Sequence, residues 1–282
     1  MENMDSGHQI KKDPKTAILL VTPGTTRNGA EKILGNCVKA FRSAYPDAVV
    51  RYAIASELVR QIITEEGVVE KSPLGALAEL IDEGFAKIIV QPLYITPGDG
   101  LHSLYTIVNT MNSFSGKHGL FGIEGILIGK PLLMNTKDYN DAAKAISSYF
   151  GTPGDGEALV LVSSVDEGGA DPSLCQLQLI MDETTAGNII IGSSYGYPGT
   201  DWVMKRLKHI NTKKVTLGTL ALIPGKHAEY ELSGDKPESW NKILENAGYE
   251  VSVSEKVLGE SPEVAGLLID SLGEVGKSHG FL

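Results

Sequence analysis

The sequence predicts an α/β fold of two similar lobes, each a parallel sheet flanked by helices, with a cleft between them. Three observations support this prediction. Short apolar runs alternate with segments of helical length along the chain, which is typical of parallel strands joined by right-handed crossovers. The order of elements in the first half recurs in the second half. The length of 282 residues also suits two lobes of ordinary size.

Strands and helices alternate regularly in the first half. Residues 16–21 form a near-continuous apolar run, as expected of a strand buried on both faces of a parallel sheet. Ser72-Pro73 is a typical helix start, because a capping serine precedes a proline at the first helical position. The predicted strands span residues 16–21, 48–53, 87–94 and 122–128, and the predicted helices span residues 28–44, 56–65, 72–83 and 101–114.

The second half repeats this order after a turn rich in glycine and proline at residues 151–156. We expect a disordered segment at residues 1–14, a first lobe at residues 15–128 and a second lobe at residues 129–282 that carries His227. The helix that closes the chain is in a position to pack back on the first lobe. The predicted helices span residues 137–150, 172–183, 200–209, 237–247 and 262–274, and the predicted strands span residues 158–162, 188–192, 214–222 and 249–253.

Composition excludes several classes of function. The formal charge of −10, from 25 basic and 35 acidic residues, argues against a nucleic-acid partner, which normally faces a basic stripe. No apolar run is long enough to span a bilayer, and the N-terminus lacks the apolar core of a signal peptide. Cys37 and Cys175 lie far apart in sequence and are interpreted as free thiols in a reducing compartment. The sequence therefore predicts a cytoplasmic protein without a membrane partner, and a homo-oligomer is compatible with it.

The stretch at residues 219–231 is the most suggestive part of the chain. Its apolar run ends at Pro224-Gly225, and His227, Glu229 and Glu231 follow at once. Residues 91–100 form a near echo, and aligning Pro97 with Pro224 superimposes one strand-plus-loop unit from each half. In open α/β sheets, ligands bind beyond the carboxyl ends of the strands. We therefore predict that His227 lies in a loop and projects into the cleft.

His227 allows two interpretations, a simple loop histidine or a base and metal ligand. Histidine suits the second role because its pKa lies near neutrality and its neutral nitrogen binds divalent metals. Glu229 and Glu231 lie close enough in sequence to add carboxylate ligands or proton acceptors. Three such residues within five positions are suggestive of a site.

The segment after the first strand is a candidate anion site. Thr25, Thr26 and Arg27 precede a helix, where backbone amides and hydroxyls can hold an anion, although a plain turn explains the segment equally well. The segment has neither the lysine of a phosphate-binding loop nor a G-x-G-x-x-G pattern, so no nucleotide is expected.

With these residues in view, almost the whole chain resembles the anaerobic sirohydrochlorin cobaltochelatases, a branch of the class II tetrapyrrole chelatases. The resemblance implies two Rossmann-like lobes with a cleft that binds a polycarboxylate tetrapyrrole. Because an acidic protein needs local cations to hold a polyanion, we expect Arg27, Lys130 and Lys226 to pair with the substrate carboxylates. The most specific matching motifs are residues 19–26, residues 90–99, Gly196-Tyr-Pro198 and residues 220–240.

The resemblance also implies a metal site of two histidines and one glutamate. His227 matches one of the histidines. Ser164 stands where the second histidine is expected, and Tyr195 stands where the glutamate is expected, directly before Gly-Tyr-Pro. Tyr94 replaces a further histidine of the first lobe. These replacements are expected to line the metal position, with Glu229 and Glu231 as substitutes for the missing carboxylate.

Our leading hypothesis is an enzyme that inserts a divalent metal into sirohydrochlorin or a related tetrapyrrole. Cobalt is the expected metal substrate, with nickel and iron as alternatives, and His227 is the expected base. The rival hypothesis is a tetrapyrrole- or corrinoid-binding protein that has kept the cleft and lost the metal site. A small-ligand binder of the periplasmic type is a weaker alternative, because a signal peptide is missing.

Overall fold

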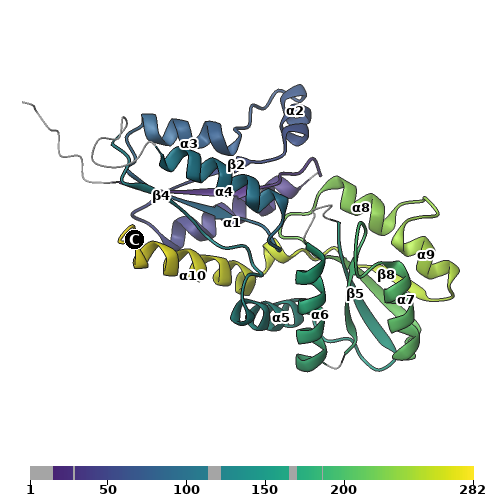
Figure 1. The fold of residues 1–282 in the computed structure, drawn as a ribbon. Coiled ribbons are helices and arrows are strands. Elements are labelled where there is room, and N and C mark those ends of the chain that lie inside the picture. The colour runs from purple at the N-terminus through teal and green to yellow at the C-terminus, as the bar shows by residue number, and fades with distance from the viewer. Residues whose placement is uncertain (1–14, 28, 114–121, 165–169, 186) are drawn as a thin grey trace, which may run out of the picture.

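The structure, a computed structural model, describes residues 15–27, 29–113, 122–164, 170–185 and 187–282, with only the backbone described at His227. The segment predicted to be disordered, residues 1–14, lies outside the described residues. Within the described part, each half of the chain forms one four-stranded parallel sheet, with strand orders β2-β1-β3-β4 and β6-β5-β7-β8 (Figure 1). The strands are β1 (Thr16–Thr22), β2 (Val49–Ile54), β3 (Lys87–Pro92), β4 (Gly125–Ile128), β5 (Glu157–Ser163), β6 (Ile189–Ser193), β7 (Lys214–Thr219) and β8 (Glu250–Val253).

The two sheets share one topology, which confirms the predicted repeat of similar α/β lobes. Helices connect successive strands, so every strand pair in the two sheets is parallel. The helices are α1 (Ala30–Ala44), α2 (Glu57–Glu65), α3 (Pro73–Asp82), α4 (Asp99–Asn112), α5 (Thr136–Phe150), α6 (Ala170–Thr184), α7 (Thr200–His209), α8 (Lys226–Ser233), α9 (Trp240–Asn246), the 3₁₀ turn η1 (Leu258–Glu260) and α10 (Pro262–Ser278).

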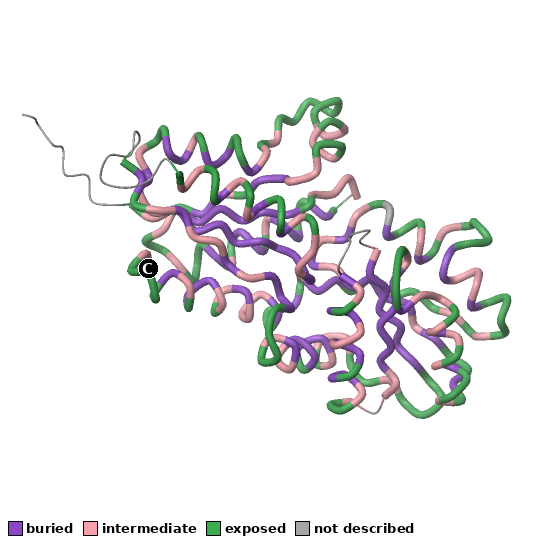
Figure 2. The backbone as a smooth tube through the Cα atoms, viewed as in Figure 1, coloured by how far each residue is buried: buried purple, intermediate pink, exposed green. Residues whose placement is uncertain are grey.

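Alternate residues of the central strands enter different apolar cores (Figure 2). Leu19 of β1 packs under α3 and α4, whereas Leu20 faces the opposite side, toward α1. In the second sheet, Val160 packs with residues of α7 and α9, and Leu161 packs with residues of α5 and α6. Both faces of each sheet are therefore covered, which explains the continuous apolar runs of the sequence.

The two lobes share one core. Leu20 of the first sheet and Leu161 of the second belong to the same apolar cluster, which also contains residues of α5 and α10. The closing helix α10 contacts α1, β3 and β4 of the first sheet as well as α5 (Figure 1). The last helix of the chain thus packs on the first lobe, and the lobes are joined by buried apolar surface rather than by a flexible linker.

Several predicted boundaries were wrong, and the largest errors lie where strands leave the sheets. Residues 220–222 were predicted to extend β7, but β7 ends at Thr219. Leu220 and Leu222 are buried in the core that the lobes share, so they are apolar without pairing in a strand. Residues 122–124 likewise precede β4, and residues 93–94 follow β3. Apolar runs of this length do not distinguish strand pairing from burial between lobes.

Gly259 of η1 is expected to tolerate no side chain. Its amide donates to the carbonyl oxygen of Leu222 at 3.0 Å, and an added Cβ would overlap that oxygen and approach Ile33 Cγ2 to 2.9 Å. Gly259→Ala is expected to lower the free energy of unfolding by about 2 kcal/mol, because overpacking forces the backbone to shift.

Gly266 in α10 provides the matched control, because an added Cβ there meets nothing within 4 Å. Gly266→Ala is expected to raise the free energy of unfolding by about 0.5 to 1 kcal/mol, since alanine loses less backbone entropy in a helix than glycine. Urea denaturation of both variants measures the difference. Equal stability of the two variants would contradict the close approach of η1 to Leu222.

Candidate functional site

The carboxyl ends of β1, β3, β5 and β7 meet between the lobes. These are the two central strands of each sheet, where the chain reverses its direction of winding. Ligands of open α/β sheets bind at this topological switch point. A pocket of about 70 Å³ lies there, lined from the first lobe by Pro23 and residues 93–96 and from the second by Ser163 and residues 220–223. Tyr94, a predicted site residue, lines this pocket and is buried.

The segment that carries His227 is a helix, so its prediction as a loop was wrong. The helix α8 begins at Lys226 and ends at Ser233, after Gly225 as the N-cap. It is the counterpart of α4, since Gly98 caps α4 and Pro97 and Pro224 each stand directly before the capping glycine. Residue 227 is the second residue of α8, and its side chain lies outside the described residues. The alignment of Pro97 with Pro224 could have predicted this helix, because a helix follows Pro97-Gly98 in the first lobe.

The helix directs Glu229 and Glu231 to different partners. Residues two apart in an α-helix lie about 200° apart around the axis. The Glu229 carboxylate pairs with Arg27, at 3.5 Å between Oε2 and Nε. The Glu231 carboxylate accepts a hydrogen bond from the Tyr195 hydroxyl. The structure therefore does not bring the two glutamates together, and Glu231 is the one that lies one helical turn after residue 227.

The first-lobe loop predicted as an anion site contacts the start of α8. The Thr25 hydroxyl donates to the carbonyl oxygen of Pro224 at 2.8 Å and accepts from the Arg27 amide at 3.0 Å. Thr26, Arg27 and Lys226 line an open pocket of about 340 Å³ together with Glu229 and Tyr230. Hydrogen bonds and an ion pair thus hold predicted site residues of both lobes around one opening.

Ser164 and Tyr195 lie on neighbouring loops at the ends of β5 and β6. The amide of Ser194 donates to the carbonyl oxygen of Ser163 at 2.9 Å, which ties the two loops together. The Trp240 indole nitrogen donates to the Ser194 hydroxyl at 3.0 Å and supports them from α9. The Ser164 Oγ is buried and has no hydrogen-bond partner within the described part of the chain. The roles of Ser194 and Trp240 were missed, because their contacts span distant segments.

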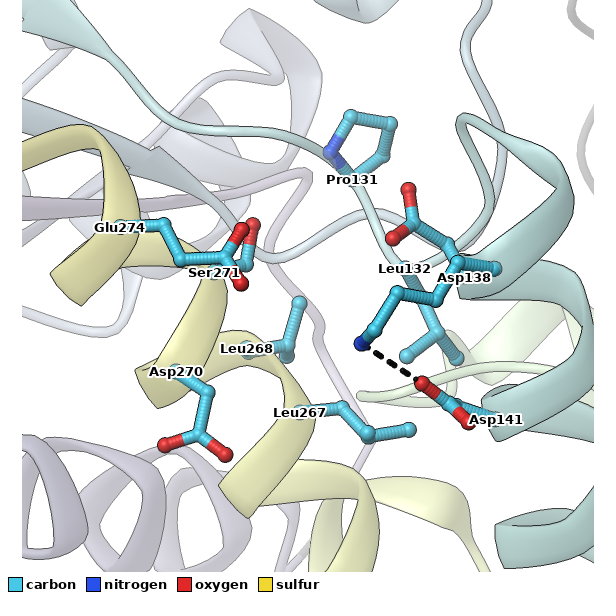
Figure 3. Close-up of a pocket in the computed structure, with 10 residues that line it drawn as sticks. Pro131, Leu132, Asp138, Asp141, Leu267, Leu268, Asp270, Ser271 and Glu274 are labelled. Carbon is cyan, nitrogen blue, oxygen red and sulfur yellow. Dashed lines mark hydrogen bonds and ion pairs between the residues drawn. The ribbon is translucent and has the colours of Figure 1, made fainter.

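Lys130 lies apart from this group. Its ammonium is 3.8 Å from a carboxylate oxygen of Glu274 on α10, beside a cavity of about 50 Å³ between α5 and α10. Figure 3 shows this cavity, which is lined by Asp138 and Asp141 of α5 and by Asp270 and Glu274 of α10. Lys137 pairs with Asp141 there at 2.9 Å. Lys130 therefore has a structural partner away from the opening beside α8.

The described residues contain no preformed group of three histidine, cysteine or acidic side chains that would hold a metal ion. Nor does any helix among them have the length and apolar character needed to cross a membrane. Both cysteines are free, and burial raises the pKa of the Cys37 thiol to about 11.

Comparison with known proteins gives a consistent result. Residues 16–277 match the family model described as cobalt chelatase (CbiK). The sirohydrochlorin cobaltochelatase CbiKC of Nitratidesulfovibrio vulgaris is 27% identical over 236 residues, which cover 83% of this chain and 81% of that protein. The sirohydrochlorin cobaltochelatase of Salmonella typhimurium is 23% identical over 262 residues, which cover 92% of this chain and 95% of that protein.

Solved structures show the same fold. SirB from Bacillus subtilis with Fe³⁺ superimposes with a TM-score of 0.63 at 16% identity, over 94% of this chain and 98% of that one. CbiX, described as the terminal enzyme of siroheme biosynthesis in denitrifying bacteria, gives a TM-score of 0.52 at 13% identity, over 92% of this chain and 99% of that one. The family match extends through both sheets and α8, so the chain belongs to the cobalt chelatase (CbiK) family.

Proposed function

We propose that this protein inserts a divalent metal, with cobalt preferred over nickel and iron, into sirohydrochlorin or a closely related tetrapyrrole. One observation carries the proposal. The helix α8, with His227 in its first turn and Glu231 one turn later, follows the carboxyl end of β7, and Thr25 and Arg27 of the first lobe contact its start. We propose that a macrocycle bound beside α8 meets the imidazole of His227 and the carboxylate of Glu231.

Metal insertion exchanges two pyrrole protons for one divalent ion, so the site must accept protons and hold the ion briefly. His227 is proposed as metal ligand and proton acceptor, because neutral imidazole performs both roles near neutral pH. Glu231 is proposed as the carboxylate that shares these tasks. Neutral hydroxyls are weak metal ligands, so Tyr195 is proposed to orient Glu231 through the hydrogen bond between them, and Ser164 to line the site.

The substrate carboxylates are proposed to bind in the opening beside the first-lobe loop. Arg27 and Lys226 supply cations there, and Thr25 and Thr26 supply hydroxyls and backbone amides. Tyr94 is proposed to support the macrocycle from the floor of the cleft. A cytoplasmic location is part of the proposal, because both cysteines are free and free thiols are typical of reducing compartments.

Anaerobic incubation of the protein with sirohydrochlorin and Co²⁺, followed by absorbance, tests the proposal. The expected result is insertion faster than in a blank without protein, and slower turnover with Ni²⁺ or Fe²⁺. Tight binding of the macrocycle with insertion no faster than in the blank would favour the rival hypothesis of a non-catalytic tetrapyrrole-binding protein. Failure to bind any tetrapyrrole would contradict both.

A further inference from the structure

Glu229 and Arg27 form an ion pair between the lobes at the edge of the proposed substrate site. Arg27 comes from the loop between β1 and α1, and Glu229 from α8. The contact runs through Nε of the guanidinium, at 3.5 Å from the carboxylate Oε2. The two terminal guanidinium nitrogens have no hydrogen-bond partner among the described residues. Those two nitrogens can still bind a carboxylate in the end-on bidentate geometry.

The surroundings of the pair leave room for an exchange of partners. Arg27 and Glu229 line both the pocket of about 340 Å³ at the start of α8 and a second pocket of about 220 Å³ that also contacts Thr219. The ion pair therefore borders both pockets. The Glu229 side chain is 53% exposed, whereas the Arg27 side chain is 29% exposed. Glu229 can therefore turn to water at little cost, while Arg27 stays in place.

The Arg27 position is fixed from the backbone. The Thr25 hydroxyl accepts from the Arg27 amide and donates to Pro224, directly before α8. Lys226 lines the same pocket as Arg27, so the pocket contains two cations and one anion. Removal of Glu229 from Arg27 would leave the pocket at the start of α8 with two cations, because the other acidic residue near Arg27, Glu255, lines only the second pocket. Such a site attracts an anionic ligand group.

From this geometry we propose that Glu229 is an internal counter-ion that a substrate carboxylate displaces from Arg27, and not a metal ligand. The inference rests on the proposed function for the identity of the substrate. Glu229 would then set the affinity and the selectivity of the site. Only a ligand with a carboxylate placed over Arg27 forms a new ion pair that replaces the one lost with Glu229. Macrocycles without that carboxylate would meet an occupied guanidinium.

A double-mutant cycle tests the proposal with metal-free sirohydrochlorin as the probe, because binding without metal is independent of catalysis. Glu229→Gln is expected to tighten binding about 5-fold and Arg27→Met to weaken it about 10-fold. In the Arg27→Met background, Glu229→Gln is expected to change affinity less than about 2-fold. Without the guanidinium, the Glu229 carboxylate and the substrate carboxylate no longer compete for one cation. The matched control is Glu65→Gln on α2, which removes the same charge at an exposed position and should leave affinity unchanged.

The outcomes separate this inference from the proposed function. Unchanged or weakened binding in Glu229→Gln, or an equal gain in both backgrounds, would overturn the role of Glu229. The same four proteins are also titrated with citrate by calorimetry. Citrate is a polycarboxylate without a macrocycle, so its affinity reports on the carboxylate pocket alone. The variants could show the predicted pattern of affinities for citrate while the wild type bound no sirohydrochlorin. The proposed function would then fail, and the role of Glu229 as an internal counter-ion would stand. If neither ligand showed the pattern, the counter-ion would be rejected.

Discussion

His227→Ala is expected to lower the rate of cobalt insertion by a factor of about 10² to 10⁴, the usual contribution of a positioned proton acceptor. Binding of metal-free sirohydrochlorin is expected to change little, because the proposed carboxylate contacts come from Arg27 and Lys226. The measurement is the insertion rate under saturating macrocycle and metal, together with the dissociation constant of the metal-free macrocycle. Loss of insertion with retained binding would separate a chemical role of His227 from a structural one.

The control for this variant is His209→Ala. His209 is exposed in the last turn of α7 and lies in no described pocket with predicted site residues. Its replacement should leave insertion within about 2-fold of the wild type, in keeping with the small effects of surface substitutions. Insertion by His227→Ala at the wild-type rate would contradict the assignment of the base to α8.

Glu231→Gln is expected to lower the insertion rate about 100-fold, because it removes the only carboxylate proposed to act beside His227. Tyr195→Phe is expected to lower the rate about 10-fold, since the hydrogen bond from its hydroxyl orients that carboxylate. In the Glu231→Gln background the added Tyr195→Phe change should have an effect below about 2-fold, because the two side chains act as one unit. Rates at saturating Co²⁺ measure all four proteins of the cycle.

Glu229→Gln is the matched comparison for the second prediction. It changes the same residue type on the same helix, but its carboxylate faces Arg27. We expect it to keep the insertion rate at saturating substrate. If Glu229→Gln lost insertion and Glu231→Gln retained it, the assignment of the two glutamates would be reversed. Purely additive effects of Tyr195→Phe and Glu231→Gln would contradict a positioning role for Tyr195.

The fold could be predicted from the sequence because its parallel strands are buried on both faces. Residues 16–21 and 158–162 are continuous apolar runs, and each forms the first strand along the chain of a sheet with the same strand order. The core that the lobes share could not be predicted, because burial of Leu220 and Leu222 between lobes leaves the same apolar pattern as a strand.

The site was predicted less completely than the fold. The resemblance to the chelatases implies metal ligands at the positions of Ser164 and Tyr195, but the sequence does not show which side chains occupy the space around them. The hydrogen bond between Tyr195 and Glu231 joins two loops that lie far apart in the chain. The helix α8 is short and polar, so its hydrophobic periodicity is weak and the sequence did not identify it as a helix. It is the helical geometry that points Glu229 and Glu231 to different sides. Such contacts follow from three-dimensional structure alone.

The most direct test of a metal position on α8 is X-ray absorption at the cobalt edge of the protein loaded with Co²⁺. We expect scattering from one imidazole per cobalt, with oxygen ligands completing the coordination, and loss of the imidazole signal in His227→Ala. Glu231→Gln should weaken cobalt binding and keep the imidazole signal. A cobalt spectrum that is unchanged in His227→Ala, or that shows two imidazoles, would contradict a metal site built from His227 and Glu231.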